Sequence, residues 1–332
     1  MESSGTMEDF SNQICIIVPC YNVQQVMRRC IDSLLDQSVK VSILIVNDGS
    51  TDETEKIALE YAGCHDNVRV ISKKNEGLPQ ARKTGIINTD CKYIGFVDAD
   101  DWVDASMYQQ LFEGAEESGS EIACCNMKIC DEEGRGTSLF KMKNCEEVLS
   151  TLDALHEIHL RRGIGASMCN KLFLRTALLE GRFPKGNFIG EDYETLITVI
   201  SNCKSVFYTD KALYFYLQSV GSMSKNGFSK THMISFAHYR RIEKQFSSEK
   251  WYADVVRYVS VEYMSFIVAM DRNKAYDPHL VEFIKKYIRR NLGVIMISGL
   301  GMKYKAAAVL CAVSEKFLNK AYSLMIEQRV NM

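Results

Sequence analysis

The chain has 332 residues, of which 46% are hydrophobic and 10% aromatic, enough apolar side chain to build the core of one large domain or of two. Its formal net charge is only −2, so it lacks the overall basic field that nucleic-acid binding usually requires. We therefore expect no nucleic acid among its partners.

The first 130 residues alternate short apolar runs, rich in β-branched residues, with longer amphipathic segments. This alternation is typical of βαβ units and predicts an α/β fold with a mixed, mostly parallel sheet flanked by helices. Ser50 and Glu53 match a capping box, which predicts that a helix opens at Ser50. The predicted strands are 14–18, 42–46, 68–72, 93–97 and 121–128.

The rest of the chain changes character twice. Residues 131–145 are polar and predict a loop or an irregular hairpin, and the next segments predict helices at 146–160 and 191–202 and a strand at 208–218. Beyond residue 230 the pattern is helical, so we place a domain boundary near 220–230. The predicted organisation is a domain over 1–225, with halves at 12–130 and 131–225, and a helical region over 226–332.

The segment FVDADDW places three aspartates directly after a hydrophobic strand. In an extended backbone Asp98 and Asp100 project to the same side, so their carboxylates can meet at one point. Such hard oxygen ligands suit Mg²⁺ or Mn²⁺, particularly when phosphates of a substrate complete the coordination. The alternative is an acidic turn in which Asp101 caps the following helix.

Two other predicted strands end in candidate binding residues. IIVPCYN places Pro19, Tyr21 and Asn22 where the sheet edge would meet a nucleoside. IVNDGSTDET places Asp48 at the strand end, where a carboxylate can accept the imide N–H of uracil, a proton that cytosine lacks. The alternatives are turn chemistry for Asp48, which precedes a glycine, and a core position for Tyr21.

Further along, KKNEGLPQARKTG contributes Asn75, Gly77 and Arg82. The guanidinium of Arg82 would suit a diphosphate, and the alternative is a solvated charge on a helix. Lys171, in the segment CNKLFLR, is a weaker candidate for contact with the phosphates or with an acceptor.

Taken together, IIVPCYN, VNDGSTDET, NEGLPQARKTG and FVDADDW, in this order and spacing, resemble the family 2 glycosyltransferases of the GT-A fold. The resemblance covers about residues 12–220 and implies a Rossmann-like sheet with a nucleotide-binding half at 12–130 and an acceptor half at 131–225. It implies that Asp48 binds uracil, that Arg82 lies near the donor phosphates, and that Asp98 lies near the ribose and the metal. Asp100 would bind the metal directly, with Ala99 between the two aspartates in the donor site.

The resemblance also implies a catalytic base downstream, and NFIGEDYETL supplies a candidate. Asp192 would take the proton from the acceptor hydroxyl, with Glu191 in a supporting role. The alternative for both residues is a favourable negative charge at a helix N-terminus. The implied reaction is a metal-assisted single displacement that inverts the anomeric centre of a UDP-sugar, in a hexosyltransferase or an N-acetylhexosaminyltransferase.

The last segment of the chain is basic. Residues 281–332 carry nine bases and three acids, a net +6, so residues 1–280 carry −8. Beside apolar runs such as AAAVLCAV, this charge suits an anionic bilayer and a lipid-linked saccharide acceptor; the alternative is a packed helical subdomain with solvated lysines.

The start MESSGTMEDF lacks the features of a signal peptide, and Lys303 and Lys305 interrupt the best candidate for a membrane span. We therefore expect a cytoplasmic protein, at the inner face of the membrane if the basic helices bind it. The sequence leaves the oligomeric state open, with a homodimer as one alternative.

Other functions fit the sequence less well. A nucleotidyltransferase would share the sheet and the acidic site, but those enzymes resemble one another in a glycine-rich basic loop where this chain has PCYN. A non-catalytic sugar-binding or scaffolding module would need neither the metal pair nor the base. The family resemblance most often implies assembly of a bacterial surface polysaccharide or glycolipid.

Overall fold

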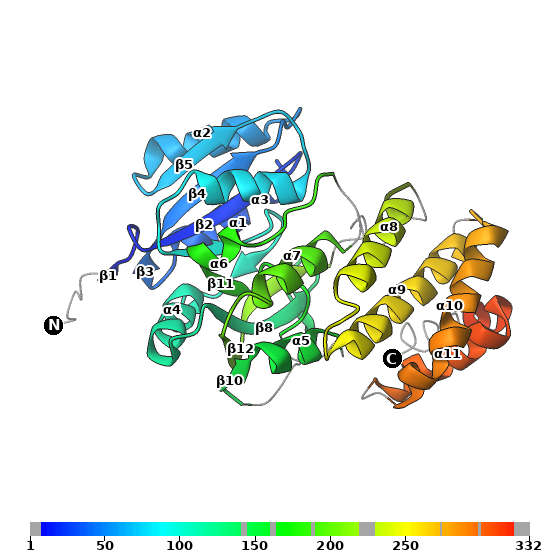
Figure 1. Cartoon of the computed structure of the whole chain (residues 1–332). Helices are drawn as coiled ribbons and strands as arrows, with labels where there is room; N and C mark the ends of the chain where they lie inside the picture. Colours follow the sequence, from blue (N-terminus) through cyan, green and yellow to red (C-terminus); the bar gives the residue numbers. More distant parts are fainter. Residues whose placement is uncertain are drawn as a thin grey trace. The chain divides into compact units, whose positions relative to one another are not determined.

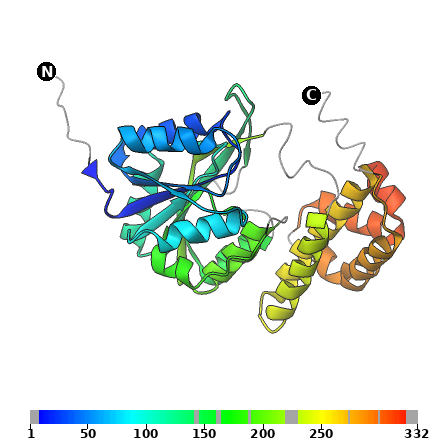
Figure 2. The ribbon, with the colours of Figure 1, turned by 90° about the horizontal axis from the view of Figure 1, so that it is seen from above.

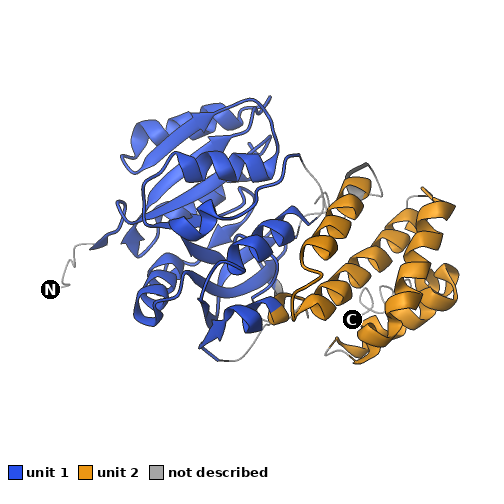
Figure 3. Ribbon diagram, viewed as in Figure 1, with its two compact units in different colours: residues 1–155, 162–220 blue, residues 156–161, 221–332 orange. Residues whose placement is uncertain are grey.

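A computed structural model of the chain describes residues 8–140, 145–159, 164–186, 190–218, 230–272, 274–297 and 300–321. The chain folds into two compact units, shown in Figure 3. Unit 1 comprises residues 1–155 and 162–220, and unit 2 comprises 156–161 and 221–332. Most of the expected boundary segment, residues 219–229, lies outside the described residues.

The first half of unit 1 is a parallel sheet in the order β6-β2-β4-β5. All seven residues of β2 are buried, as expected for a central parallel strand covered on both faces. These strands confirm four of the predicted ones, and their bounds are Ile14–Cys20 (β2), Ser42–Asn47 (β4), Val68–Ser72 (β5) and Tyr93–Phe96 (β6).

The second half of unit 1 extends this sheet with mixed pairing. β11 (Lys171–Leu174) lies antiparallel between β6 and β8 (Ile122–Cys130), and β12 (Ser205–Leu217) is parallel to β8. The predicted helix over 146–160 is wrong at its start, because Glu147–Ser150 forms β10, paired with β12, before α5 (Thr151–His159) begins.

Four short strands complete the strand pairings among the described residues. β9 (Gly136–Phe140) forms a hairpin with β8, and β7 (Trp102–Val103) pairs with β12. A separate two-stranded ribbon joins β1 (Glu8–Asp9) to β3 (Val39–Lys40).

Helices cover both faces of the sheet, as Figures 1 and 2 show. The predicted capping box is wrong: α2 begins at Thr54, and the Ser50 hydroxyl instead accepts the N–H of Asn22 at 3.1 Å. The helices are Met27–Leu35 (α1), Thr54–Cys64 (α2), Leu78–Ile87 (α3), Met107–Ser118 (α4), Arg175–Leu179 (α6) and Glu191–Ile200 (α7).

Unit 2 is helical, in agreement with the sequence pattern beyond residue 230. α9 buries side chains on most of its surface because α8, α10 and α11 all pack against it. Its Tyr263 ring lies 4.9 Å from the ring of Phe236 and 5.0 Å from that of Tyr287. The helices are Lys230–Gln245 (α8), Tyr252–Arg272 (α9), Pro278–Ile297 (α10) and Met302–Val313 (α11).

The described helices fall short of a membrane span. Among them, none is both long and apolar enough to cross a lipid bilayer.

Close packing of α3 on the central strand generates a prediction. A Cβ added at Gly85 would lie 2.5 Å from Cγ2 of Ile17 in β2, so we expect Gly85→Ala to destabilise the fold by about 1–3 kcal/mol. Gly63, in α2, has nothing within 4 Å of such a Cβ, and Gly63→Ala should stabilise by up to about 1 kcal/mol. Urea denaturation of both variants measures the difference, and equal midpoints would contradict the packing described.

Candidate active site

The acidic segment after β6 has an alternating pattern of burial. Asp98 and Asp100 are partly exposed, whereas Ala99 and Asp101 are buried. The predicted pair of aspartates therefore reaches the same surface. Burial, and then the negative charge of Asp98, raises the pKa of Asp100 to about 6.

Asp101 has a different role from the one considered in the sequence. Its carboxylate accepts the hydroxyl of Tyr214 at 2.5 Å and the N–H of Leu217 at 2.7 Å, both from β12. The next helix, α4, begins at Met107 and is not capped by Asp101. Asp101 thus fastens the acidic segment to β12, a contact that no local sequence signal indicated.

Arg82, on α3, lies between two carboxylates from distant parts of the chain. Its Nη2 donates to Oδ1 of Asp98 at 2.9 Å, and its Nη1 donates to Oδ1 of Asp192. Only 2% of the residue is exposed, so the alternative of a solvated helix charge is wrong. Nη2 also lies 3.5 Å from Sγ of Cys169.

Asp192 and Glu191 open α7, as the sequence predicted for a helix over 191–202. Oδ2 of Asp192 accepts the N–H of Met168 at 3.2 Å, so each of its oxygens has a partner. Burial, followed by the negative charge of Asp192, raises the pKa of Glu191 to about 8.

Lys171 does not reach the surface of this site. It is fully buried, and its ammonium donates to the carbonyls of Ile164 and Ser167 at 2.7 Å each and to Oδ1 of Asn170 at 2.8 Å. An ammonium has three N–H donors, and all three are used here. The suggested contact of Lys171 with phosphates or an acceptor is therefore wrong, and the side chain holds the segment 164–170 in place.

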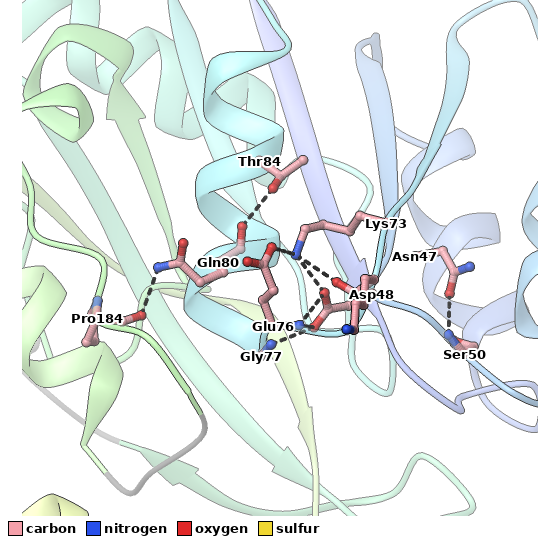
Figure 4. A network of polar contacts seen from close by, with 10 residues as sticks. Asn47, Asp48, Ser50, Lys73, Glu76, Gly77, Gln80, Thr84 and Pro184 are labelled. Atoms are coloured by element: carbon pink, nitrogen blue, oxygen red, sulfur yellow. Dashed lines mark hydrogen bonds and ion pairs between the residues drawn. The ribbon is translucent and has the colours of Figure 1, made fainter.

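Asp48 lies at the end of β4 in a network of polar contacts, shown in Figure 4. Its carboxylate accepts the N–H of Gly77 at 2.8 Å, the N–H of Glu76 at 3.1 Å, and Nζ of Lys73 at 3.0 Å. Lys73 is not among the residues that the sequence predicted for this site. Gly77 has a φ of 93°, a conformation that favours glycine and turns the two amides toward Asp48.

The loops after β2 and β4 are tied together by Asn22. Its Oδ1 accepts the N–H of Thr51 at 2.8 Å. Tyr21 beside it is 48% exposed, so the alternative of a core aromatic is wrong. Pro19 is buried in β2, where it lies opposite Val46 of β4. It is therefore part of the sheet interior and not of the exposed surface at the strand end.

The loop after β5 passes close to the loop after β4. Asn75 is exposed, and its backbone nitrogen lies 2.8 Å from the place where a Cβ on Gly49 would be. Gly49 also has a φ of 75°. Glycine is required here by both the approach and the backbone conformation.

The predicted residues therefore fall into two groups at one sheet edge, because β2, β4, β5 and β6 are parallel and end on the same side. One group surrounds Asp48 and the other surrounds Arg82, and α3 connects them. Within the described residues, no set of three or more histidine, cysteine, aspartate or glutamate side chains is arranged to hold a metal ion. Asp98 and Asp100 are the two partly exposed carboxylates of the acidic segment.

Comparison with known proteins gives consistent results. The family model described as Glycosyl transferase family 2 matches residues 15–177. The glycosyltransferase GlyA of Streptococcus pneumoniae is 32% identical over 222 residues, which are 64% of this chain and 32% of GlyA. The uncharacterized glycosyltransferase EpsJ of Bacillus subtilis is 29% identical over 299 residues, 86% of this chain and 84% of EpsJ. The chain thus spans about a third of the first relative and most of the second.

Among solved structures, S. aureus TarS 1–349 in complex with UDP-GlcNAc has a TM-score of 0.72 to this chain. The match covers 94% of this chain and 92% of that one, at 18% sequence identity. It confirms the predicted mixed α/β fold with a C-terminal helical region.

The raised pKa of Glu191 generates a prediction about stability. The folded protein holds this proton up to about pH 8, whereas the unfolded chain releases it near 4.5, so the fold loses stability as the pH rises between those values. We expect Glu191→Gln to raise the melting temperature relative to the wild type at pH 9, with a smaller difference at pH 4. A difference that is the same at both pH values would contradict the burial of this carboxyl.

Proposed function

We propose that the chain, whose residues 15–177 match the family model described as Glycosyl transferase family 2, transfers a sugar from a UDP-sugar to a hydroxyl of a glycan or a lipid-linked saccharide, with inversion. The observation that carries the proposal is the convergence of Asp98 and Asp192 on Arg82. These carboxylates come from opposite halves of unit 1, yet they lie in one site. The glycosyltransferase names of the relatives support the same activity.

The donor base would bind at the Asp48 group. Asp48 is 3% exposed, and two amides and the ammonium of Lys73 make four contacts with its carboxylate. The imide N–H of uracil would therefore take the place of Lys73, which also pairs with Glu76. The ring of Tyr21 and the side chain of Asn75 are exposed at the same edge. The crystal structure of TarS with UDP-GlcNAc supports a UDP-sugar as donor.

The acidic segment fits a divalent cation. Asp98, Asp100 and Asp192 carry three carboxylates, and the guanidinium of Arg82 pairs with two of them, Asp98 and Asp192. Burial, and then the charge of Asp98, raises the pKa of Asp100. Asp98 and Asp100 would hold Mn²⁺ or Mg²⁺ together with the donor phosphates. When bound, the ion would neutralise charge on the departing nucleoside diphosphate.

Asp192 is the proposed general base. It takes the proton of the acceptor hydroxyl as the acceptor oxygen bonds to the anomeric carbon and the bond from that carbon to the diphosphate oxygen breaks. Attack from the face opposite the leaving group inverts the anomeric centre. Glu191, protonated up to about pH 8, adds no second negative charge at neutral pH beside the base.

This mechanism predicts two different losses. Asp192→Asn should lower the transfer rate by about 10²–10⁴-fold and leave UDP binding nearly unchanged, because the residue acts on the acceptor. Asp100→Ala should instead remove the Mn²⁺ dependence of UDP binding. Calorimetry with UDP, with and without Mn²⁺, and a screen of UDP-sugars for hydrolysis and transfer measure both effects.

Asp90→Asn is the matched control, because Asp90 is exposed and lies outside the site. Full turnover by Asp192→Asn would place the base elsewhere. A protein that binds UDP-sugars but neither hydrolyses nor transfers any of them would be a sugar-binding module.

We also infer that unit 2 contacts the inner face of an anionic membrane, facing the cytoplasm. Val309 and Val313 follow Met302 in α11 by seven and eleven residues, so the three side chains lie on one face of the helix. All three are exposed. Ile297, at the end of α10, is 87% exposed.

The charge around this apolar stripe favours lipid over a second copy of the chain. Residues 278–321 carry eight bases and two acids, so two copies would bring like charges together, whereas anionic headgroups are complementary. Such a surface suits a lipid-linked acceptor.

We expect the full chain to float with vesicles that contain anionic lipid and not with neutral ones. Met302→Ser combined with Val313→Ser should weaken binding about tenfold or more, because each buried apolar side chain contributes about 1.5–3 kcal/mol. Leu59→Ser, at an exposed apolar residue of α2, is the control. Equal flotation of all variants would exclude the stripe, and concentration-dependent dimers lost in the double variant would favour self-association.

A further inference from the structure

We propose that Arg82 is a positioning residue that fixes the separation of Asp98 and Asp192, and is not a ligand of the donor phosphates. The inference rests on the proposed function and deepens it. The guanidinium of Arg82 would position both Asp98, which is proposed to bind the cation, and Asp192, which is proposed to be the base.

The first argument is the geometry of the guanidinium. The group is planar and rigid, and its two terminal nitrogens contact different carboxylates, Nη2 contacting Asp98 and Nη1 contacting Asp192. Their spacing is therefore set by covalent geometry. A lysine ammonium at the end of a flexible chain is a single point and cannot hold two carboxylates in the same way.

The second argument is burial. Arg82 is 2% exposed and its Cζ lies 5.8 Å from the centroid of the Phe96 ring, whereas Lys83, the next residue of α3, is exposed. Burying a charge in this way costs several kcal/mol unless good partners offset it, and the two carboxylates are those partners. A phosphate could reach the guanidinium only if the residues that cover it moved, because 2% of Arg82 is exposed.

The third argument is that the frame around the pair is fixed. α3 packs so closely on β2 that Gly85 has no room for a Cβ, which fixes the helix that carries Arg82. The other oxygen of Asp192 is held by the N–H of Met168, and the buried ammonium of Lys171 holds the carbonyl of the preceding residue, Ser167. Asp192 is thus held from two directions.

A general base that shifts by about 1 Å can lose about 10²-fold in rate. We therefore expect Arg82→Lys to lower kcat by about 10²-fold while the Kd for UDP, measured without metal, changes less than about threefold. Lys83→Met, on the same helix, should leave both unchanged. A large rise in the Kd for UDP with kcat retained at saturation would mark Arg82 as a phosphate ligand and overturn the proposal.

A double-mutant cycle tests whether Arg82 acts through Asp192. Asp192→Glu keeps a carboxylate, so its residual kcat is measurable alone and together with Arg82→Lys. We expect the double variant to lose much less than the product of the two single losses, because both disturb one contact. Losses that multiply would show that Arg82 acts independently of the base.

If Arg82→Lys does not fold, a crystal structure of the wild-type protein with UDP and Mn²⁺ decides the question. Arg82 should remain between the two carboxylates, and a hydrogen bond from its guanidinium to a phosphate oxygen would refute the proposal. Failure of the proposed function itself would appear separately, as an absence of transfer by the wild type with every UDP-sugar.

Discussion

One buried ion pair network constrains unit 1. A guanidinium removed from water must be paired, and Arg82 has two carboxylates beside it, Asp98 and Asp192. Three segments therefore have to meet: α3, the acidic segment after β6, and the start of α7. The site that we assign to catalysis is the place where this requirement is met.

The mixed topology of the sheet makes the meeting possible. Parallel strands bring the ends of β2, β4, β5 and β6 to one edge, which explains why Asp48, Asn22 and the acidic segment are neighbours. The antiparallel insertion of β11 beside β6 then carries Met168 and Cys169 to the same place. β12 adds Tyr214 and the N–H of Leu217, which hold Asp101 under the two partly exposed aspartates.

The two units differ in charge, and we propose a different role for each: catalysis for unit 1 and membrane contact for unit 2. Unit 1 contains the acidic segment and the candidate base, whereas α10 and α11 of unit 2 carry the excess of bases and the exposed apolar stripe. A soluble donor and an acceptor held at a membrane would require these two chemistries. The match of residues 15–177 to the Glycosyl transferase family 2 model supports the first, and the surface of α11 supports the second.

The sequence by itself determined what depends on local pattern. β-branched runs predicted β2, β4, β5 and β6 because strand formation follows side-chain alternation and burial, and the positions of Asp98, Asp100 and Asp48 at strand ends followed from the same runs. Helical periodicity likewise predicted α7 and the helical region beyond residue 230.

Only the tertiary structure decided which partner each polar group has. The local sequence does not show that Arg82 is buried between two aspartates or that Asp101 binds β12. Nor does it show that the ammonium of Lys171 donates all its hydrogen bonds to buried oxygens. The helix prediction fails at Glu147–Ser150 because this segment pairs with β12, and that long-range contact overrides its local preference. Such contacts form when they offset the free-energy cost of burying a charge or complete the hydrogen bonds of a sheet. Their partners are segments far away in the chain, so the local sequence does not reveal them.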